Sequence, residues 1–131
     1  GELQQLARSN RRIVALGDIS EERLIGYYAG ARALVQPALA EGFGLPMLEA
    51  MAVGCPVIAS AEAVPRVLEP AALTFAPDAP DELRARIEAV LNDATLRARL
   101  AERGRDVART LTWDRCARAT ADLYHEVLET A

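Results

Sequence analysis

The stretch from residue 41 to residue 50, which reads EGFGLPMLEA, constrains the fold of this chain more than any other part. Gly42 and Gly44 flank one aromatic residue, and glycine suits positions where a backbone turns sharply or approaches a ligand closely. Pro46 follows, and proline is favoured at the first position of a helix, where its missing N–H would have had no partner. A tight turn leading into a helix is therefore predicted. Two carboxylates with seven residues between them lie on it: Glu41 on the turn and Glu49 in the opening turns of the helix.

Apolar runs and helical patterns alternate through the first two thirds of the chain. The short apolar runs predict buried strands, and the segments between them carry helix signals such as the N-cap Ser20 with acidic residues after it. Such alternation implies parallel strands, because a parallel pair needs a long crossover that a helix usually provides. The predicted strands cover residues 13–16, 33–36, 56–59 and 73–75, and the predicted helices cover residues 2–8, 20–31 and 46–54.

The last third of the chain is predicted to be helical throughout. One helix opens at Asp81 and breaks at Asn92, and a second carries leucines on one side. A third begins at Thr112, and its apolar residues form a continuous stripe that suits core packing or docking onto another domain. The stripe comprises Trp113, Cys116, Ala117, Thr120, Leu123, Tyr124, Val127 and Leu128.

Composition limits the class of protein. The chain has 131 residues, of which 51% are hydrophobic, and this is enough apolar material for one globular domain. A net charge of −4 argues against a nucleic-acid partner, and no apolar run approaches the roughly 20 residues of a membrane span. The absence of lysine excludes catalysis by a side-chain amine. Cys55 and Cys116 are expected to be reduced, mostly buried thiols, His125 is expected on the surface, and the protein is expected to be cytoplasmic.

The carboxyl ends of the predicted strands gather candidate binding groups. In open parallel sheets, ligands bind outside these ends, where the loops into the following helices meet. Free N–H groups at Gly44, Leu45 and Met47, with the positive end of the helix, favour an anion such as a diphosphate. Ionised carboxylates accept hydrogen bonds from sugar and ribose hydroxyls, so the combination suggests a nucleotide sugar. The loops expected around this crevice cover residues 18–20, 41–45 and 60–65.

Four segments resemble a known family. They are VQP at 35–37, EGFGLP at 41–46, LEAMA at 48–52 and GCPVIAS at 54–60, and they are similar to the C-terminal donor-binding domain of retaining GT-B glycosyltransferases of family 4, group 1. Many bacterial mannosyl- and glucosyltransferases belong to this group. The resemblance covers nearly the whole chain and implies an α/β fold, in which a Rossmann-like parallel sheet is flanked by helices and followed by a helical C-terminal tail.

The resemblance also assigns roles to residues. Glu41 would contact hydroxyls of the transferred sugar and stabilise an oxocarbenium-like state, and Glu49 would hold the ribose hydroxyls. No metal or other cofactor is implied. The backbone of Gly42, Phe43, Gly44 and Leu45 would line the sugar and diphosphate, and Asp18, Ile19 and Ser20 would pass near the nucleobase.

Purely structural roles stay open for some of these residues. Glu41 could only cap a turn, and Glu49 could only complement the dipole of its helix. Phe43 could anchor the loop in the core, and Trp113 is expected to serve packing. The presence of both carboxylates on this one loop favours the functional interpretation.

Two departures from the family pattern affect the site. Members carry Pro-Glu after the third strand, whereas this chain reads AEAVPR at 61–66, so Arg66 reverses a charge beside the crevice. The basic residues that clamp the diphosphate, the first strands of this domain and the acceptor-binding N-terminal domain would all precede residue 1. Residues 1–131 are therefore expected to form a single partial domain that is inactive alone and self-associates through exposed apolar surface.

Three functions are compatible with the GT-B architecture. The first is the donor-binding half of a retaining glycosyltransferase that transfers a hexose to a glycan or lipid-linked acceptor bound by the N-terminal domain. The second is a non-catalytic nucleotide-sugar-binding or regulatory module. Sugar-nucleotide epimerases share the GT-B architecture but not the pattern around Glu41 and Glu49. The resemblance leans toward mannosyl transfer from a GDP sugar, and it leaves open UDP- and ADP-sugars, the acceptor and a peripheral membrane contact of the parent protein.

Overall fold

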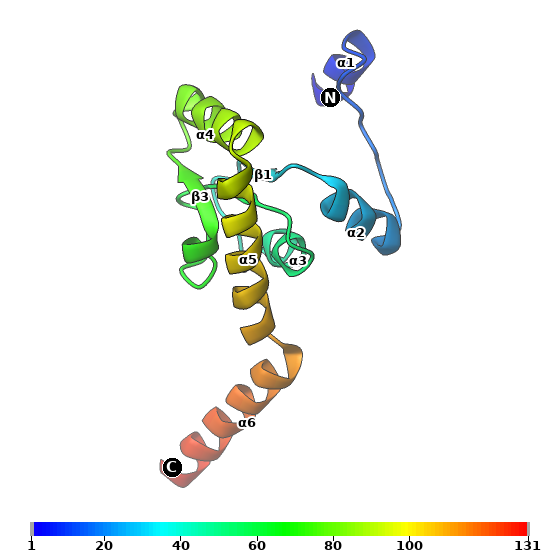
Figure 1. Cartoon of the computed structure of the whole chain (residues 1–131). Helices are drawn as coiled ribbons and strands as arrows, with labels where there is room; N and C mark the ends of the chain where they lie inside the picture. Colours follow the sequence, from blue (N-terminus) through cyan, green and yellow to red (C-terminus); the bar gives the residue numbers. More distant parts are fainter. Residues whose placement is uncertain (1, 131) are drawn as a thin grey trace.

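A computed structural model describes residues 2–130, apart from the side chains of Glu2 and Leu3. Three parallel strands form a sheet in the order β1-β2-β3, and helices connect and flank them, so the predicted α/β class is confirmed (Figure 1). The elements are α1 (Glu2–Ser9), α2 (Glu21–Gly30), β1 (Leu34–Gln36), α3 (Leu45–Ala52), β2 (Val57–Ser60), the 3₁₀ helix η1 (Glu69–Ala71), β3 (Ala72–Phe75), α4 (Pro80–Asn92), α5 (Ala94–Thr110) and α6 (Trp113–Thr130).

Local signals set the ends of the helices close to where they are predicted. Ser20 caps α2, because its Oγ accepts a hydrogen bond of 3.4 Å from the N–H of Arg23. Asp93 caps α5 in the same way, through a 2.9 Å hydrogen bond from the N–H of Leu96. Gly54 follows the end of α3 with a φ of 80°, the left-handed conformation in which glycine commonly ends a helix.

The sheet separates two apolar layers, and β2 contributes to both. Side chains of a strand alternate between the two faces of its sheet. Val57 accordingly packs in the layer that contains Met47 of α3, whereas Ile58 packs in the layer that contains Val90 of α4. All four residues of β2 are buried, as expected for a central strand covered on both faces.

The predicted strand at residues 13–16 is wrong. This segment connects α1 to α2 as irregular chain that runs outside the body of the molecule (Figure 1), and Val14 is 73% exposed. A strand requires a neighbour that exchanges backbone hydrogen bonds with it. Within residues 2–130 no strand pairs with this segment, so its apolar character does not produce a strand.

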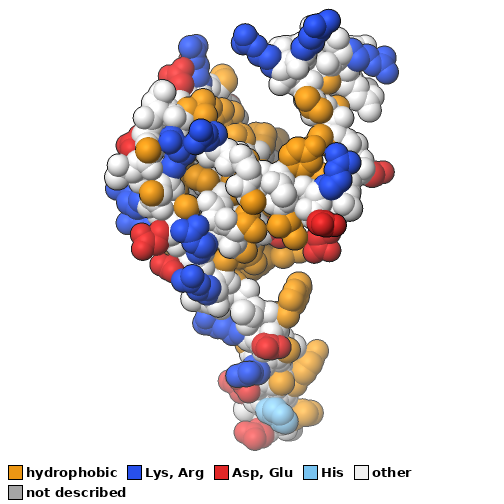
Figure 2. Space-filling view, turned by 45° about the vertical axis from the view of Figure 1, so that its right-hand side comes forward, with side chains coloured by type: hydrophobic (Ala, Val, Ile, Leu, Met, Phe, Trp, Pro, Cys, Tyr) orange, Lys and Arg blue, Asp and Glu red, His pale blue; other side chains and the backbone are white. Residues whose placement is uncertain are grey.

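The apolar stripe of α6 is exposed. No described residue of α6 is buried, Trp113 is 80% exposed, and apolar side chains run along one side of the helix beyond the body of the molecule (Figure 2). Core packing within the described chain is therefore the wrong interpretation of this stripe, including its tryptophan. Docking onto another domain stays a prediction.

The two cysteines differ in environment. Cys55 is buried as predicted, and burial raises the pKa of its thiol because a thiolate is poorly solvated there. Cys116 is exposed, so the prediction of a buried thiol is wrong at this position, because it lies on the unpartnered helix α6. His125 is exposed, as predicted.

Candidate functional site

The turn before α3 has the backbone conformation predicted for Gly44, but the prediction is wrong for Gly42, which has no positive φ and no atom within 4 Å of an added Cβ. Gly44 is the N-cap residue of α3 and has a φ of 74°, in the left-handed region that favours glycine. A Cβ atom at this position would overlap with Cε of Met47 and lie 3.4 Å from Cδ of Pro65. Leu45 opens the helix one residue earlier than predicted, and Pro46 lies in its first turn.

The loop that follows β2 lies against this turn. Pro65 belongs to that loop and borders Gly44, as expected for the loop at residues 60–65. The loop folds back on the strand end, because the N–H groups of Ala63 and Val64 both donate to the carbonyl oxygen of Ser60 at 3.1 Å. The carboxyl ends of the neighbouring strands β1 and β2 thus send their loops to one region, which is where open parallel sheets bind ligands.

Glu41 lies on the turn and is exposed. Its Oε1 accepts a hydrogen bond from Nε2 of Gln36, the last residue of β1. Its Oε2 has no hydrogen-bond partner in the described part of the chain, so this oxygen is available to a ligand. No role in the site is predicted from the sequence for Gln36, although it is a polar residue at the end of an apolar strand, five positions before Glu41.

Glu49 lies on α3 and is exposed, and it is close enough to the buried Tyr28 of α2 to interact with it electrostatically. Burial raises the pKa of the Tyr28 hydroxyl, and repulsion from the carboxylate of Glu49, and from Cys55 when its thiol is ionised, raises it further. The hydroxyl of Tyr28 therefore stays protonated at neutral pH. The second predicted carboxylate thus stands on a regular helix, at the side where α2 packs against α3.

The N–H groups at the start of α3 are only partly available to an anion. The N–H of Met47 donates to the carbonyl oxygen of Gly44 at 2.9 Å, so the prediction that it is free is wrong. This hydrogen bond closes the first turn of α3, so the N–H of Met47 is already used within the helix. The N–H groups of Gly44 and Leu45 receive no partner within residues 2–130, as expected for the first positions of a helix.

The other residues predicted for the site differ in exposure and in their position relative to the turn. Phe43 is 45% exposed, so it does not anchor the loop in the core, and Leu45 beside the turn is 46% exposed. Asp18 and Ser20 are exposed and Ile19 is half-buried, on the segment that leads into α2. The described chain shows no hydrogen bond or ion pair between these three residues and the turn, and their role stays a prediction.

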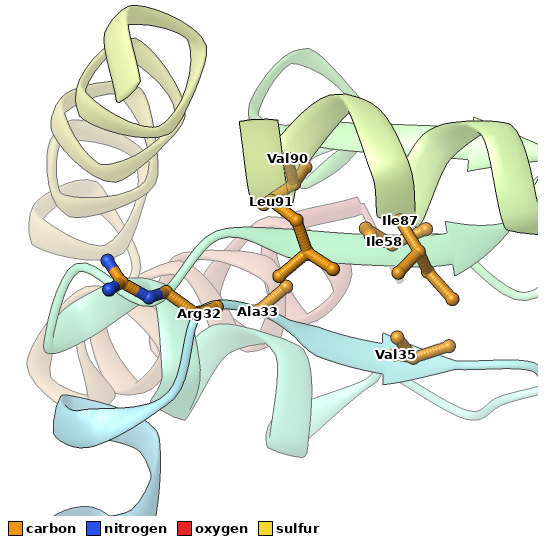
Figure 3. Close-up of a pocket in the computed structure, with 7 residues that line it drawn as sticks. All are labelled: Arg32, Ala33, Val35, Ile58, Ile87, Val90 and Leu91. Carbon is orange, nitrogen blue, oxygen red and sulfur yellow. The ribbon is translucent and has the colours of Figure 1, made fainter. Parts of the chain in front are cut away.

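Two cavities lie away from the residues that are predicted to form the ligand site. An open one of about 460 Å³ is lined by residues of η1 and α5. The other, of about 150 Å³, lies between the sheet and α4, and Figure 3 shows apolar side chains of both converging on it. Neither cavity includes Glu41 or Glu49. The second is lined by Arg32, Ala33, Val35, Ile58, Ile87, Val90 and Leu91.

Residues 2–130 lack two features that would point to a metal or to a membrane span. They contain no cluster of three or more His, Cys, Asp or Glu side chains that could hold a metal ion. None of their helices combines the length and the apolar character needed to cross a bilayer. The expectation that the site needs no metal stays a prediction.

The fold matches that of solved glycosyltransferase structures. Sucrose-phosphate synthase from Thermosynechococcus elongatus superimposes with a TM-score of 0.82 and 31% identity, over 99% of this chain and 34% of that chain. The C-terminal domain of a glycosyl transferase group 1 family protein from Francisella tularensis gives a TM-score of 0.71 and 29% identity, over 83% of this chain and 60% of that chain. The chain therefore has the fold of part of a GT-B C-terminal domain.

Sequence relatives agree with the fold. O-antigen chain mannosyltransferase B of Escherichia coli is 38% identical over 110 residues, which cover 83% of this chain and 29% of that protein. MMP alpha-(1->4)-mannosyltransferase of Mycolicibacterium hassiacum is 36% identical over 115 residues, which cover 84% of this chain and 28% of that protein. The family model described as glycosyl transferases group 1 matches residues 2–107. The chain belongs to this family, and it spans less than a third of the length of these two curated relatives.

Proposed function

We propose that this chain is the donor-binding half of a retaining glycosyltransferase, and that its ligand is a nucleotide-diphosphate sugar. The observation that carries the proposal is the turn before α3. One oxygen of Glu41 and the N–H groups of Gly44 and Leu45 are without partners there, at the carboxyl end of two parallel strands. A carboxylate accepts sugar hydroxyls, and free N–H groups at a helix N-terminus attract phosphate oxygens.

These groups have distinct roles in the proposed reaction. The bond between the sugar C1 and the phosphate oxygen breaks, and its electron pair leaves with the diphosphate, which the N–H groups of Gly44 and Leu45 stabilise. The negative charge of Glu41 stabilises the positive charge that develops on the sugar ring. The acceptor hydroxyl attacks from the face that the leaving group vacates and gives its proton to the departing phosphate oxygen, so the configuration at C1 is retained.

The nucleoside is held by a different part of the site. Glu49 accepts hydrogen bonds from the ribose hydroxyls, and its position on the packed helix α3 keeps it in place. Asp18, Ile19 and Ser20 pass near the base. Two relatives are named mannosyltransferases, which supports mannose as the transferred sugar. GDP-mannose is the proposed donor, and a glycan or lipid-linked molecule is the proposed acceptor.

Activity is proposed for a protein in which this chain is joined to an acceptor-binding domain, because the named mannosyltransferases extend far beyond it. The 131 residues alone are proposed to bind donor without transferring sugar. The alternative is a nucleotide-sugar-binding module without catalysis. It is favoured by Arg66, an exposed cation next to the Pro65 that borders the turn.

Glu41→Gln in such a joined protein tests the proposed function. The amide keeps the size of the side chain but removes its charge, so we expect kcat for mannosyl transfer from GDP-mannose to fall by about 100-fold or more. Binding of GDP should be unchanged, because the nucleotide does not contact this side chain. Glu102→Gln, the same change on an exposed position of α5, is the control.

Unchanged transfer by Glu41→Gln would contradict the proposed role of this carboxylate. The binding-module alternative predicts a different result. A wild-type protein that binds GDP-mannose but transfers no sugar to any acceptor, with binding weakened by Glu41→Gln, would favour that alternative.

A further inference from the structure

Glu41 receives its hydrogen bond from the strand that precedes it. Nε2 of Gln36 donates to Oε1 of Glu41. An ionised carboxylate only accepts hydrogen bonds, so the NH₂ group of the glutamine amide must face it. The bond therefore connects the end of β1 to the turn that leads into α3.

The two partners differ in how firmly the fold holds them. Gln36 is half-buried and lies in the ladder of the sheet, opposite the fully buried Ala59 of β2. Glu41 is exposed on irregular chain. Ordering such a side chain costs conformational entropy, and a donor on a paired strand reduces the freedom that a ligand would otherwise have to remove.

The donor is also neutral. The chain has fifteen basic residues, all of them arginine, and the ion pairs of the described residues are Arg84–Glu88, Arg86–Glu82 and Arg109–Asp106. None of these pairs includes Glu41. A glutamine amide orients the carboxylate of Glu41 without neutralising it, whereas an arginine in its place would compensate the negative charge.

We infer that Gln36 is a positioning residue for the proposed reaction. It holds Oε1 of Glu41 so that Oε2 faces the transferred sugar with its negative charge uncompensated. This inference rests on the proposed function, because it requires that Glu41 acts on the sugar. It adds a specific requirement, namely a neutral hydrogen-bond donor at the end of β1.

The test uses the joined protein and GDP-mannose as the donor. Gln36→Leu has a similar size but no donor, and we expect kcat to fall about tenfold or more, as for the loss of a hydrogen bond to a charged group. The double variant Gln36→Leu/Glu41→Gln should be no slower than Glu41→Gln alone, because Gln36 acts only through that carboxylate. Gln5→Leu, the same change on exposed α1, is the control and should leave kcat unchanged.

Two further substitutions separate orientation from charge. Gln36→His, measured at pH 8 where the ring is neutral, can still donate and should recover part of the lost rate. Gln36→Arg also donates but adds a positive charge, and it should stay slow. If Gln36→Leu does not fold, as judged by circular dichroism, Gln36→Asn tests the same step, because its shorter side chain withdraws the amide from Glu41.

The outcomes separate this inference from the proposed function. Full activity of Gln36→Leu beside an impaired Glu41→Gln would overturn the role of Gln36 and leave the proposed function standing. Losses that multiply in the double variant would also overturn it, since they would show that Gln36 acts independently of Glu41. Full activity of Glu41→Gln would overturn both.

Discussion

Gly44 is the residue near the candidate site where backbone and packing constraints coincide. Its φ of 74° disfavours any other residue, and a Cβ there would overlap with Met47. Gly42, two positions earlier in the same turn, has no positive φ and no atom within 4 Å of an added Cβ. The two glycines of one motif therefore differ in what they require of the fold.

Gly44→Ala should lower the free energy of unfolding by roughly 1–3 kcal/mol, because the left-handed backbone and the overlap with Met47 must both be accommodated. Urea titration followed by circular dichroism measures this loss. Gly42→Ala is the matched control, and its effect should be much smaller. Equal losses for the two variants would show that the constraint at Gly44 is not specific.

At the scale of elements, the junction of β3 and α4 is held by a polar cluster. Oε2 of Glu82 accepts a hydrogen bond of 2.9 Å from the N–H of Ala76, and its Oε1 accepts one of 2.9 Å from Nη2 of Arg86. Arg86 in turn donates from Nε to the carbonyl oxygen of Thr74 at 2.9 Å. The helix is thereby attached to the end of the strand, and the pKa of Glu82 is lowered, first by the Ala76 N–H and then by Arg86.

Glu82→Gln should lower Tm at pH 7, and the difference from wild type should depend on pH. A carboxylate whose pKa is lowered in the folded state contributes its full stabilisation when the pH lies above its ordinary pKa of 4.5. It loses this contribution as the pH falls through the pKa of the folded state. The Tm difference should therefore be largest at neutral pH and should disappear at acidic pH. Thermal scans between pH 7 and strongly acidic pH measure it.

Glu88→Gln is the control for this prediction, because it breaks the exposed pair with Arg84 on the same helix. Exposed pairs of this kind contribute little to stability, so its Tm should change less. A Tm difference for Glu82→Gln that did not depend on pH would contradict an ionic role of Glu82.

At the scale of the whole molecule, exposed apolar segments and a strand edge are left without partners within residues 2–130. The segment at residues 13–16, the free edge of β1 and the stripe of α6 all lack partners in the described chain. Such surfaces promote association, because burying them against one another removes apolar area from water. We therefore expect the isolated chain to self-associate as its concentration rises.

Trp113 reports on this association directly, because it is the only tryptophan and is 80% exposed. Its fluorescence maximum should move to shorter wavelength with concentration, in parallel with the mass measured by sedimentation. Leu128→Glu in the stripe should weaken both changes. His125→Glu adds the same negative charge on the polar side of α6 and is the control.

A mass that stays monomeric at all concentrations would contradict the expected self-association. An unchanged association of Leu128→Glu would instead show that α6 is not the surface involved, and would leave the segment at residues 13–16 and the edge of β1 as the remaining candidates.

Much of the fold could be predicted from the sequence because its signals are local. Ser20 caps α2, Gly54 ends α3, and strand and helix alternate within two residues of their predicted bounds. The segment at residues 13–16 could not be predicted correctly, because its apolar pattern shows a preference for burial and not the presence of a strand beside it. The candidate site could be predicted from its motif, but the contact of Gln36 with Glu41 could not, since it depends on how the loop after β1 folds back.

By itself, the sequence determined the type and approximate ends of most elements, the turn before α3 and the identity of its two carboxylates. These features depend on backbone preferences and hydrogen bonds among residues a few positions apart. Only the tertiary structure decided that Pro65 borders Gly44, that Gln36 faces Glu41, and that α6 stands exposed. Contacts of this kind depend on where separate parts of the chain meet in space, and no local pattern specifies that.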